Sequence, residues 1–470
     1  MIKTLHVDLC VIGAGAAGLS VAAGAVQLGW DVALIEKDKM GGDCLNTGCV
    51  PSKSLLAAAK AAHTIRTAHK YGITAHEPDI DIRALKQHVD GVIKTIAPHD
   101  SEERFEGLGV KVFREQAVFT AKDTIAAGAQ AITAKYFVIA AGSRPRIPPI
   151  PGLDPARILT NETIFALTEK PAHLIIIGAG PIGMEMAQAH RRLGSKVTVL
   201  DAGPLLPRDD PDAAAALRDI LREEGVKFHE NAAIDRIEHG KNVAVIAGNT
   251  RVEGSHLLIA AGRQAATDGL GLEKAGVQCN EKGIVTGRRL RTTNPRIYAA
   301  GDIAGGPQFT HVAGYHAGII IRNMIFKIPA KTDYSALPRV TYTDPELAQA
   351  GLTEKEAREK YGDSIRISKA RFRENDRAQA ERQTEGFIKV ITRGNRIIGA
   401  TILGPYAGEL IGMWSLAIAR KMKIAAIAGM IAPYPTYGEI GKRAAGAHFS
   451  AALFSGRTRF LTGLLRRLPF

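Results

Sequence analysis

The first half of the chain alternates short apolar runs with glycine-rich turns and alanine-rich stretches, a pattern that predicts buried strands followed by helices. Residues 8–12 form one apolar run, and three glycines follow it at Gly13, Gly15 and Gly18. An alanine-rich stretch comes next, and a second apolar run at residues 32–35 ends at Glu36. We therefore predict a strand, a tight turn, a helix and a second strand in this order.

The same arrangement returns later in the chain, which makes it an internal repeat. Residues 174–177 lead into Gly178, Gly180 and Gly183, and the helix and strand that follow end at Asp201. The first glycine precedes the acid by 23 positions in both copies. A G-x-G-x-x-G turn between a strand and a helix, with an acid about 20 residues later, is the fingerprint of dinucleotide binding. Backbone amides approach a pyrophosphate at the glycines, and the acid binds a ribose hydroxyl, so two copies predict two dinucleotide sites.

Beyond residue 336 the pattern changes towards paired strands. Apolar runs at 387–391 and 397–403 flank Gly394 and Asn395, which is a hairpin signal. A further strand is expected within 337–343, with a turn after it, and helical sequence from about residue 409 to residue 430. This segment is expected to fold as a separate domain.

Length and composition suit an ordinary globular protein of about three domains. The cysteines Cys10, Cys44, Cys49 and Cys279 are too few for a disulfide-stapled secreted protein. Cys10 lies in an apolar run and is expected to be inert core, and Cys279 stands alone in a polar stretch. Charges interrupt the apolar residues 413–432, so we predict no membrane span and a cytoplasmic protein.

The formal charge of +14 is the unusual feature of the composition. We expect no nucleic-acid partner, because no aromatic-interleaved basic motif accompanies the charge. A dispersed basic surface that attracts anionic dinucleotides explains it more simply. Residues 455–470 are basic, apolar and free of acids. They have two interpretations: a contact with a membrane surface, which would make the protein peripheral to the membrane, or a frayed terminus.

Candidate redox chemistry lies at residues 41–54, shortly after the first fingerprint. Cys44 and Cys49 have four residues between them, and Lys53 follows closely. A lysine charge stabilises a neighbouring thiolate, the reactive form of cysteine. On its own the pair is equally compatible with two buried cysteines or half of a metal site. Its position places the thiols within reach of a bound redox cofactor.

The segment GGDCLNTGCVPSK at 41–53 resembles the redox motif of the flavoprotein disulfide reductases, GG-x-C-x4-C-[VI]-P-[ST]-K, a family that includes dihydrolipoamide dehydrogenase, glutathione reductase and mercuric reductase. The resemblance extends from about residue 5 to about residue 450. It implies an α/β fold with two Rossmann-like dinucleotide-binding domains and a C-terminal α+β dimerisation domain. The implied boundaries are 1–145 for the FAD-binding domain, 146–266 for the NAD(P)-binding domain, 267–335 for the return to the FAD and central domain, and 336–470 for the interface domain.

The resemblance also implies the cofactors and the partner. FAD would occupy the first site and a nicotinamide dinucleotide the second. Asp201 favours NAD(H), because a carboxylate accepts hydrogen bonds from a 2′-hydroxyl and repels a 2′-phosphate, so NADP(H) is the less favoured cofactor. Members of the family are homodimers, and the partner chain lends residues to the active site. No resident metal is expected.

Residue roles follow from the resemblance position by position. Cys49 would be the thiol that faces the flavin, and Cys44 the interchange thiol that meets the substrate. Lys53 would lie at the flavin and pair with Glu185. Asp302 would bind the ribityl chain. The remaining implied cofactor contacts are Gly42, Asp43, Ala117, Ala141, Gly142, Gly262, Thr310 and His311.

Two positions depart from the family pattern. Relatives carry a histidine base in H-P-T-x-x-E, and here the segment begins with Tyr434 and keeps Glu439. A phenol has an ordinary pKa of about 10, against about 6.5 for imidazole, which makes it a poor proton shuttle near neutrality. Asp43 stands where most relatives have threonine, and its charge would raise the pKa of Cys44.

Three functional hypotheses remain open. The first is a disulfide reductase of the dihydrolipoamide dehydrogenase type, acting on a small dithiol or disulfide or on a lipoyl-carrying protein. The second is a metal-ion or quinone reductase, for which the missing histidine matters less. Mercuric reductases also carry tyrosine at this place, but their C-terminal cysteine pair has no counterpart here. The third is a redox sensor with slow turnover.

Overall fold

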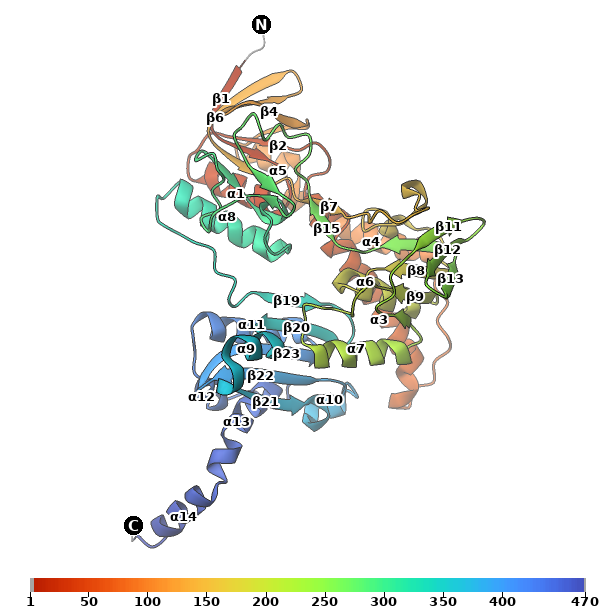
Figure 1. Cartoon of the computed structure of the whole chain (residues 1–470), viewed down its shortest axis with the longest axis vertical. Coiled ribbons are helices and arrows are strands. Elements are labelled where there is room, and N and C mark those ends of the chain that lie inside the picture. Colours follow the sequence, from red (N-terminus) through yellow and green to blue (C-terminus); the bar gives the residue numbers. More distant parts are fainter. Residues whose placement is uncertain (1–3, 469–470) are drawn as a thin grey trace.

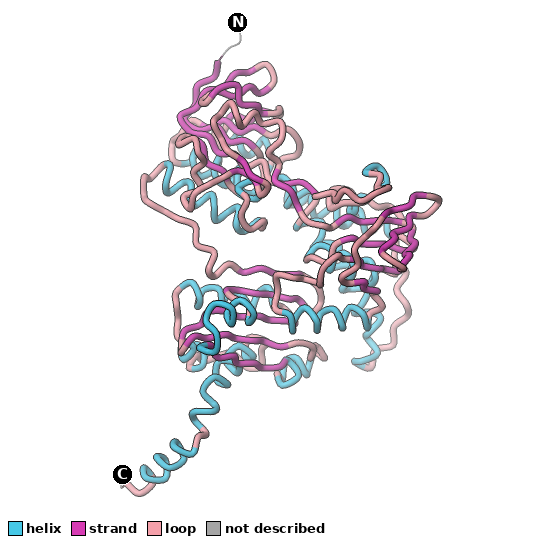
Figure 2. The backbone as a smooth tube through the Cα atoms, in the orientation of Figure 1, coloured by secondary structure: helices cyan, strands magenta, loops and turns pink. Residues whose placement is uncertain are grey.

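The computed structural model describes residues 4–468, whose elements gather into three sheet-centred groups and one projecting helix (Figure 1). The chain begins in the first group, passes to the second and returns to the first. It enters the third group by a long loop between α8 (Thr310–Met324) and β19 (Pro338–Thr341) (Figure 2). The projecting helix is α14 (Gly456–Leu465).

The first group is built on a sheet with the strand order β3-β2-β1-β6-β5-β4, in which β18 also pairs with β6. Its parallel strands are β1 (Thr4–Ile12), β2 (Val32–Ile35), β3 (Lys111–Phe113), β6 (Gln130–Ile139) and β18 (Ile297–Ala299), and β4 (Ala117–Ala121) and β5 (Thr124–Ala127) continue it antiparallel. Helix α1 (Ala16–Gln27) packs against α8. Cys10 is fully buried, which confirms its predicted place in the core.

Two strands of this sheet are longer than their apolar runs predict. Strands β1 and β6 pair from Thr4 and Ala131 to Ile12 and Ile139. In β1 residues 4–8 alternate polar and apolar side chains, and this alternation escapes a criterion based on continuous apolar runs.

The second group is a parallel sheet in the order β10-β9-β8-β14. The strands are β8 (His173–Ile177), β9 (Lys196–Leu200), β10 (Lys227–His229) and β14 (His256–Ile259). Helices α3 (Cys49–Thr67) and α6 (Pro181–Arg192) pack against each other beside it, and an antiparallel sheet of β11 (Arg236–His239), β12 (Val243–Ala247) and β13 (Thr250–Gly254) adjoins it. The chain crosses between the two groups on β7 (Ser143–Pro145) and β15 (Arg263–Ala265), which pair antiparallel.

The third group is an antiparallel sheet in the order β19-β20-β23-β22-β21. Its other strands are β20 (Glu346–Gly351), β21 (Ile365–Arg371), β22 (Phe387–Arg393) and β23 (Arg396–Gly404), so the predicted hairpin around Gly394 is present. Helix α13 (Glu439–Leu453) packs on β21 and β22.

The predicted helical sequence over 409–430 forms two helices. Helix α11 (Ala407–Ala419) ends before Lys421, whose φ of 53° lies in the left-handed region. The Met422 amide then donates to the Ala417 carbonyl at 2.8 Å and closes the helix end. A new helix, α12 (Ile424–Ala428), follows.

Shorter elements complete the described chain. The helices are α2 (Gly42–Asn46), α4 (Ile82–Ile96), α5 (Glu102–Gly107), α7 (Pro211–Glu223), α9 (Glu354–Tyr361) and α10 (Asp376–Ala380), and the strands are β16 (Cys279–Asn280) and β17 (Gly283–Ile284). The 3₁₀ turns are η1 (Ala68–Tyr71), η2 (Ala97–Asp100), η3 (Pro155–Arg157), η4 (Ile164–Ala166), η5 (Gly301–Ala304), η6 (Gly362–Ser364) and η7 (Phe372–Glu374). Within residues 4–468, none of the helices has the length and apolar content needed to cross a membrane.

A buried ionic cluster joins the second group to the third. Lys389 on β22 has a side chain only 3% exposed, and its Nζ lies 2.9 Å from Asp210, 2.8 Å from Asp212 and 2.9 Å from Glu354. Asp210 caps α7 and is fully buried. The ammonium group therefore holds α7 of the second group and α9 against the third sheet.

Replacing Lys389 with methionine should lower stability by about 3–5 kcal/mol, because the fully buried carboxylate of Asp210 would lose its cation. Chemical denaturation followed by circular dichroism measures the change. The matched control is Lys369→Met on β21, whose exposed ammonium lies 3.9 Å from Asp212 and should contribute about 0–1 kcal/mol. Equal losses in the two variants would contradict the importance of the buried cluster.

Candidate functional site

The first glycine-rich turn has the shape of a pyrophosphate cradle. A Cβ on Gly13 or Gly18 would lie closer than 3.0 Å to the backbone, at Ala140 and Gly13 respectively, so the turn and helix α1 pack too tightly for a side chain. A Cβ on Gly15 would meet nothing within 4 Å. The turn is therefore closed towards the protein and open on one side, where the N-terminus of α1 begins.

The second turn repeats this geometry. Side chains on Gly178 and Gly183 would collide with the backbone at Ala260 and Gly178, whereas Gly180, the N-cap of α6, faces open space. Two separate segments of the chain therefore form the same kind of turn, as expected for two dinucleotide-binding sites.

The predicted ribose acids lie where the fingerprint requires them. Glu36 follows β2, and its carboxylate accepts the amides of Ala14 at 2.6 Å and Asp38 at 2.8 Å. Asp201 follows β9 and accepts the amides of Ala179 at 2.7 Å and Gly203 at 2.8 Å. Each acid is thus fixed against its own glycine-rich turn, with lone pairs left for hydroxyl donors.

The redox segment packs directly on the first turn. The Gly41 amide donates to the Ala14 carbonyl at 2.9 Å. A Cβ on Gly42 would lie 2.8 Å from Gly15 Cα, so a glycine is required at this contact. The contact fixes α2, which carries Cys44, beside the turn that would bind the first dinucleotide.

The two thiols are unequal. Cys49 begins α3, is exposed, and its Sγ lies 3.3 Å from Thr310 Oγ1. A hydrogen bond from Cys44, together with Thr310 and Lys53, lowers the pKa of Cys49 to about 6, against the opposing effect of burial. The same hydrogen bond and burial raise the pKa of Cys44. The charge of Asp43 raises the pKa of both thiols, as predicted for Cys44.

Lys53 on α3 and Glu185 on α6 form an ion pair where these two helices pack together. Lys53 Nζ lies 2.7 Å from Glu185 Oε2, and Glu185 is buried. Glu185 Oε1 accepts the amide of Tyr342 at 2.9 Å, and the Tyr342 ring lies under the ammonium at 4.4 Å. Tyr342 was not found from the sequence, because it belongs to no motif and its turn signal, Asp344-Pro345, follows it.

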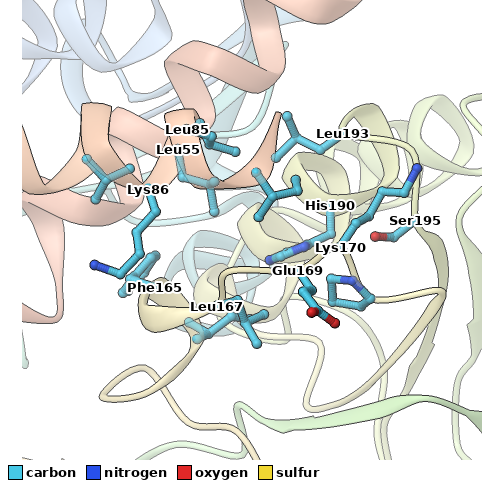
Figure 3. Close-up of a pocket in the computed structure, with 14 residues that line it drawn as sticks. Leu55, Leu85, Lys86, Phe165, Leu167, Glu169, Lys170, His190, Leu193 and Ser195 are labelled. Carbon is cyan, nitrogen blue, oxygen red and sulfur yellow. The ribbon is translucent and has the colours of Figure 1, made fainter. Parts of the chain in front are cut away.

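A pocket lies between α3, α4, η4 and the end of α6 (Figure 3). Leu55, Phe165 and Leu193 supply apolar walls. Within the described chain, His190 Nε2 and Ser195 Oγ line the pocket without a hydrogen-bond partner. Burial lowers the pKa of His190 to about 4, so this histidine is neutral near pH 7 and unsuited to carry a proton there.

Asp302 belongs to a chain of charged groups that ends at the redox segment. Its carboxylate accepts the Ser143 hydroxyl, and Arg263 Nε lies 2.7 Å from the same hydroxyl. Arg263 Nη2 also lies 3.3 Å from Asp43, so the guanidinium stands between the two acids. Burial raises the pKa of Asp302, with Ser143 and Arg263 opposing. Arg263, which was not among the residues predicted from the sequence, is an additional candidate for contact with an anionic cofactor.

The other predicted cofactor contacts lie in different surroundings. Gly142 and Gly262 have positive φ values of 70° and 105° and face open space, and Ala141 precedes the first of them. His311 Nε2 lies 3.0 Å from the Pro338 carbonyl, and burial lowers its pKa. Ala117 is buried in the core of the first sheet, so its side chain is not available to a ligand.

Tyr434 and Glu439 lie in the third group. Tyr434 is 69% exposed, and its hydroxyl donates to Asp376 at 2.9 Å, which raises its pKa. Glu439 begins α13. Within residues 4–468 no hydrogen bond joins either residue to Cys44 or Cys49, and no cluster of His, Cys, Asp and Glu is arranged for a metal ion.

Family comparisons cover almost the whole chain. A family model described as pyridine nucleotide-disulphide oxidoreductase matches residues 7–317, and one described as the dimerisation domain of these proteins matches residues 337–445. A mercuric reductase from Streptomyces lividans is 36% identical over 452 residues, covering 93% of this chain and 95% of the relative. A dihydrolipoyl dehydrogenase from Geobacillus stearothermophilus is 35% identical over 455 residues, covering 94% and 96%.

Solved structures give the same result. The HOCl-induced flavoprotein disulfide reductase RclA from Escherichia coli, solved as a Cu(II) complex, is 30% identical with a TM-score of 0.85. The match covers 93% of this chain and 99% of RclA. LpdA from Mycobacterium tuberculosis is 28% identical with a TM-score of 0.86, over 93% of this chain and 99% of LpdA.

The difference in pKa between the two thiols predicts that two substitutions shift the reactivity of Cys49 in opposite directions along the pH scale. In a Cys279→Ala background, which removes the other exposed thiol, alkylation of Cys49 in the reduced protein should be half-maximal near pH 6. Cys44→Ala should move this midpoint to higher pH, because the hydrogen bond to the thiolate is lost. Asp43→Asn should move it to lower pH, because a negative charge is lost. Iodoacetamide rates followed by mass spectrometry measure both, and a midpoint unchanged by Cys44→Ala would contradict the assignment.

Proposed function

Because the chain belongs to the pyridine nucleotide-disulphide oxidoreductases, as the redox motif predicted, we propose that Cys44 and Cys49 form its redox-active disulfide and that Cys44 delivers electrons to the acceptor. Proteins of this family bind FAD and NAD(P)H. The matches to the dimerisation-domain model and to the solved structure of RclA confirm the predicted α/β fold with a dimerisation domain. The observation that carries the proposal is the thiol pair with a low-pKa Cys49 beside Thr310 and a protonated Cys44.

Both dinucleotide sites fit the groups that the family binds. Gly13, Gly15, Gly18 and Glu36 would hold the FAD, and the second turn with Asp201 would hold the nicotinamide dinucleotide. FAD, when bound, supplies two-electron transfer between a nicotinamide and a disulfide. Lys53, fixed by Glu185, would keep a positive charge beside Cys49 and stabilise its thiolate.

The proposed exchange with a disulfide acceptor balances as follows. Cys44, once deprotonated, attacks one sulfur of the acceptor, forms a mixed disulfide and releases the first thiolate. The Cys49 thiolate then attacks Cys44 Sγ, which closes the protein disulfide and releases the second thiolate. The acceptor gains two electrons and the cysteine pair loses two. The Cys44 proton and one proton from water convert the two released thiolates to thiols, because Cys49 already reacts as a thiolate.

Deprotonation of Cys44 is the demanding step, because its pKa is raised. In the proposed homodimer, Tyr434 of the partner subunit would face Cys44, where relatives have the histidine base. The Asp376 hydrogen bond raises the pKa of Tyr434 further from neutrality, so the phenol is a weak proton acceptor. This observation favours a second candidate acceptor, a thiophilic metal ion that displaces the thiol protons to water on binding both sulfurs.

We further propose the boundaries 145, 266 and 335 between the domains, and the homodimer that the dimerisation domain supports. A cytoplasmic location is proposed from the cysteine usage. A peripheral position at a membrane surface is proposed from the exposed basic helix α14. Pro469 and Phe470 of the predicted tail lie outside the described residues.

The acceptor is tested by NADH oxidation with lipoamide, glutathione disulfide, mercuric ion and quinones. We expect slow turnover of lipoamide by the native protein. Tyr434→His should raise it at least tenfold near pH 7, because a positioned general base contributes about 10² to 10⁴ in rate. Tyr434→Phe is the matched control and should give no gain. High lipoamide turnover in the native protein together with a loss in Tyr434→His would refute the role given to Tyr434.

The nicotinamide preference is tested by steady-state kinetics with both coenzymes. We expect kcat/KM to favour NADH over NADPH by at least tenfold, about 1.4 kcal/mol in transition-state binding, because Asp201 would repel a 2′-phosphate. Asp201→Asn keeps the size of the side chain, removes the charge and should narrow the ratio. A native protein with equal kcat/KM for NADPH and NADH would refute this proposal.

A further inference from the structure

Helix α14 projects from the body of the protein and has no buried residue. The last buried residue of α13 is His448, and no residue of α14 is buried. The two helices meet at Phe454 and Ser455, where the Ser455 hydroxyl accepts the Thr458 amide and starts the new helix. Figure 1 shows α14 beyond the third group, away from the other sheets.

The exposed surface is strongly apolar. Between 45% and 70% of each of these residues is exposed: Leu453, Phe454, Phe460, Leu461, Leu464, Leu465 and Leu468. Phe460, Leu461, Leu464 and Leu465 recur at helical spacing and share one side of α14. A patch of this kind on a soluble surface marks an interaction site.

The charges around the patch have one sign. Residues 440–468 contain no acid, and Arg457, Arg459, Arg466 and Arg467 lie in or next to α14. Arg459 and Thr462 occupy the side opposite Phe460 and Leu464. Arg457 lies on the apolar side itself, one turn before Phe460 and Leu461, and its long side chain can extend past the patch to the headgroup level.

We propose that α14 is an interfacial anchor that binds the surface of a membrane rich in anionic lipids. A helix of ten residues is about 15 Å long, half the thickness of a hydrocarbon core, so it lies in the interface and does not span. The apolar side enters the boundary of the acyl chains, and the arginines meet phosphate groups. This inference rests on the proposed peripheral position and is independent of the reaction.

The test is flotation of the full-length protein with vesicles of phosphatidylcholine alone or with phosphatidylglycerol. Binding to the anionic vesicles should be at least tenfold tighter and should weaken as salt rises from about 50 mM to about 500 mM. Phe460→Ser with Leu464→Ser should abolish binding. Arg466→Gln with Arg467→Gln should weaken it about tenfold or more. Equal affinity for both vesicles, or undiminished binding by the first double variant, would overturn the proposal.

Matched controls separate the helix from general surface effects. Ile73 is 58% exposed, like Leu461, and Ile73→Ser should leave vesicle binding unchanged. Arg289→Gln is the corresponding control for charge. NADH-dependent reduction of a soluble acceptor, measured on the same samples, should be equal in all variants, so a failed anchor is distinguishable from a failed enzyme.

Trypsin tests whether a second copy of the chain covers α14 instead. The arginine bonds at 457, 459, 466 and 467 should be cleaved in solution and protected when anionic vesicles are added. Protection without lipid would show that the apolar side is buried in the dimer and would overturn the proposal.

Discussion

The ion pair between Lys53 and Glu185 is the constraint on which the arrangement of the site depends. It joins the helix that starts at Cys49 to the helix that starts at the second glycine-rich turn. Glu185 is buried, and its second oxygen holds the Tyr342 backbone of the third group. One carboxylate thus fixes the start of α3, which carries Cys49, against the helix after the second glycine-rich turn and against the sheet of the third group.

The sequence alone predicted those features of the fold and the site that depend on residues close together in the chain. Each glycine-rich turn, its acid and the C-x4-C segment follow from residue type and spacing, because tight backbone packing at Gly13 or Gly183 excludes other residues. The β22–β23 hairpin followed from a turn signal between two apolar runs. The pairing of Lys53 with Glu185, 132 residues apart, came from the family resemblance and not from any spacing in the chain.

Other features lay beyond the sequence because they arise only when distant segments meet. Arg263 between Asp43 and Asp302, Asp376 under Tyr434 and the Tyr342 ring belong to no motif. The break between α11 and α12 depends on one residue in the left-handed region and on a closing amide bond, in a stretch whose apolar content favours one helix. Strands β1 and β6 extend beyond their apolar runs because each pairs with the other over its whole length. This pairing cannot be recognised from either run alone.

The narrow crossing between the first and second groups has a mechanical consequence. The second and third groups are fastened by Lys389, by Arg192 with Asp344, and by Arg339 with Asp209. The first group is tied to them by the short β7–β15 ribbon and helix α3. A change of backbone angles in this ribbon would therefore turn the first group relative to the other two. Arg263 of the ribbon lies 3.3 Å from Asp43, the neighbour of Cys44, so such a rotation would be felt first beside the two thiols.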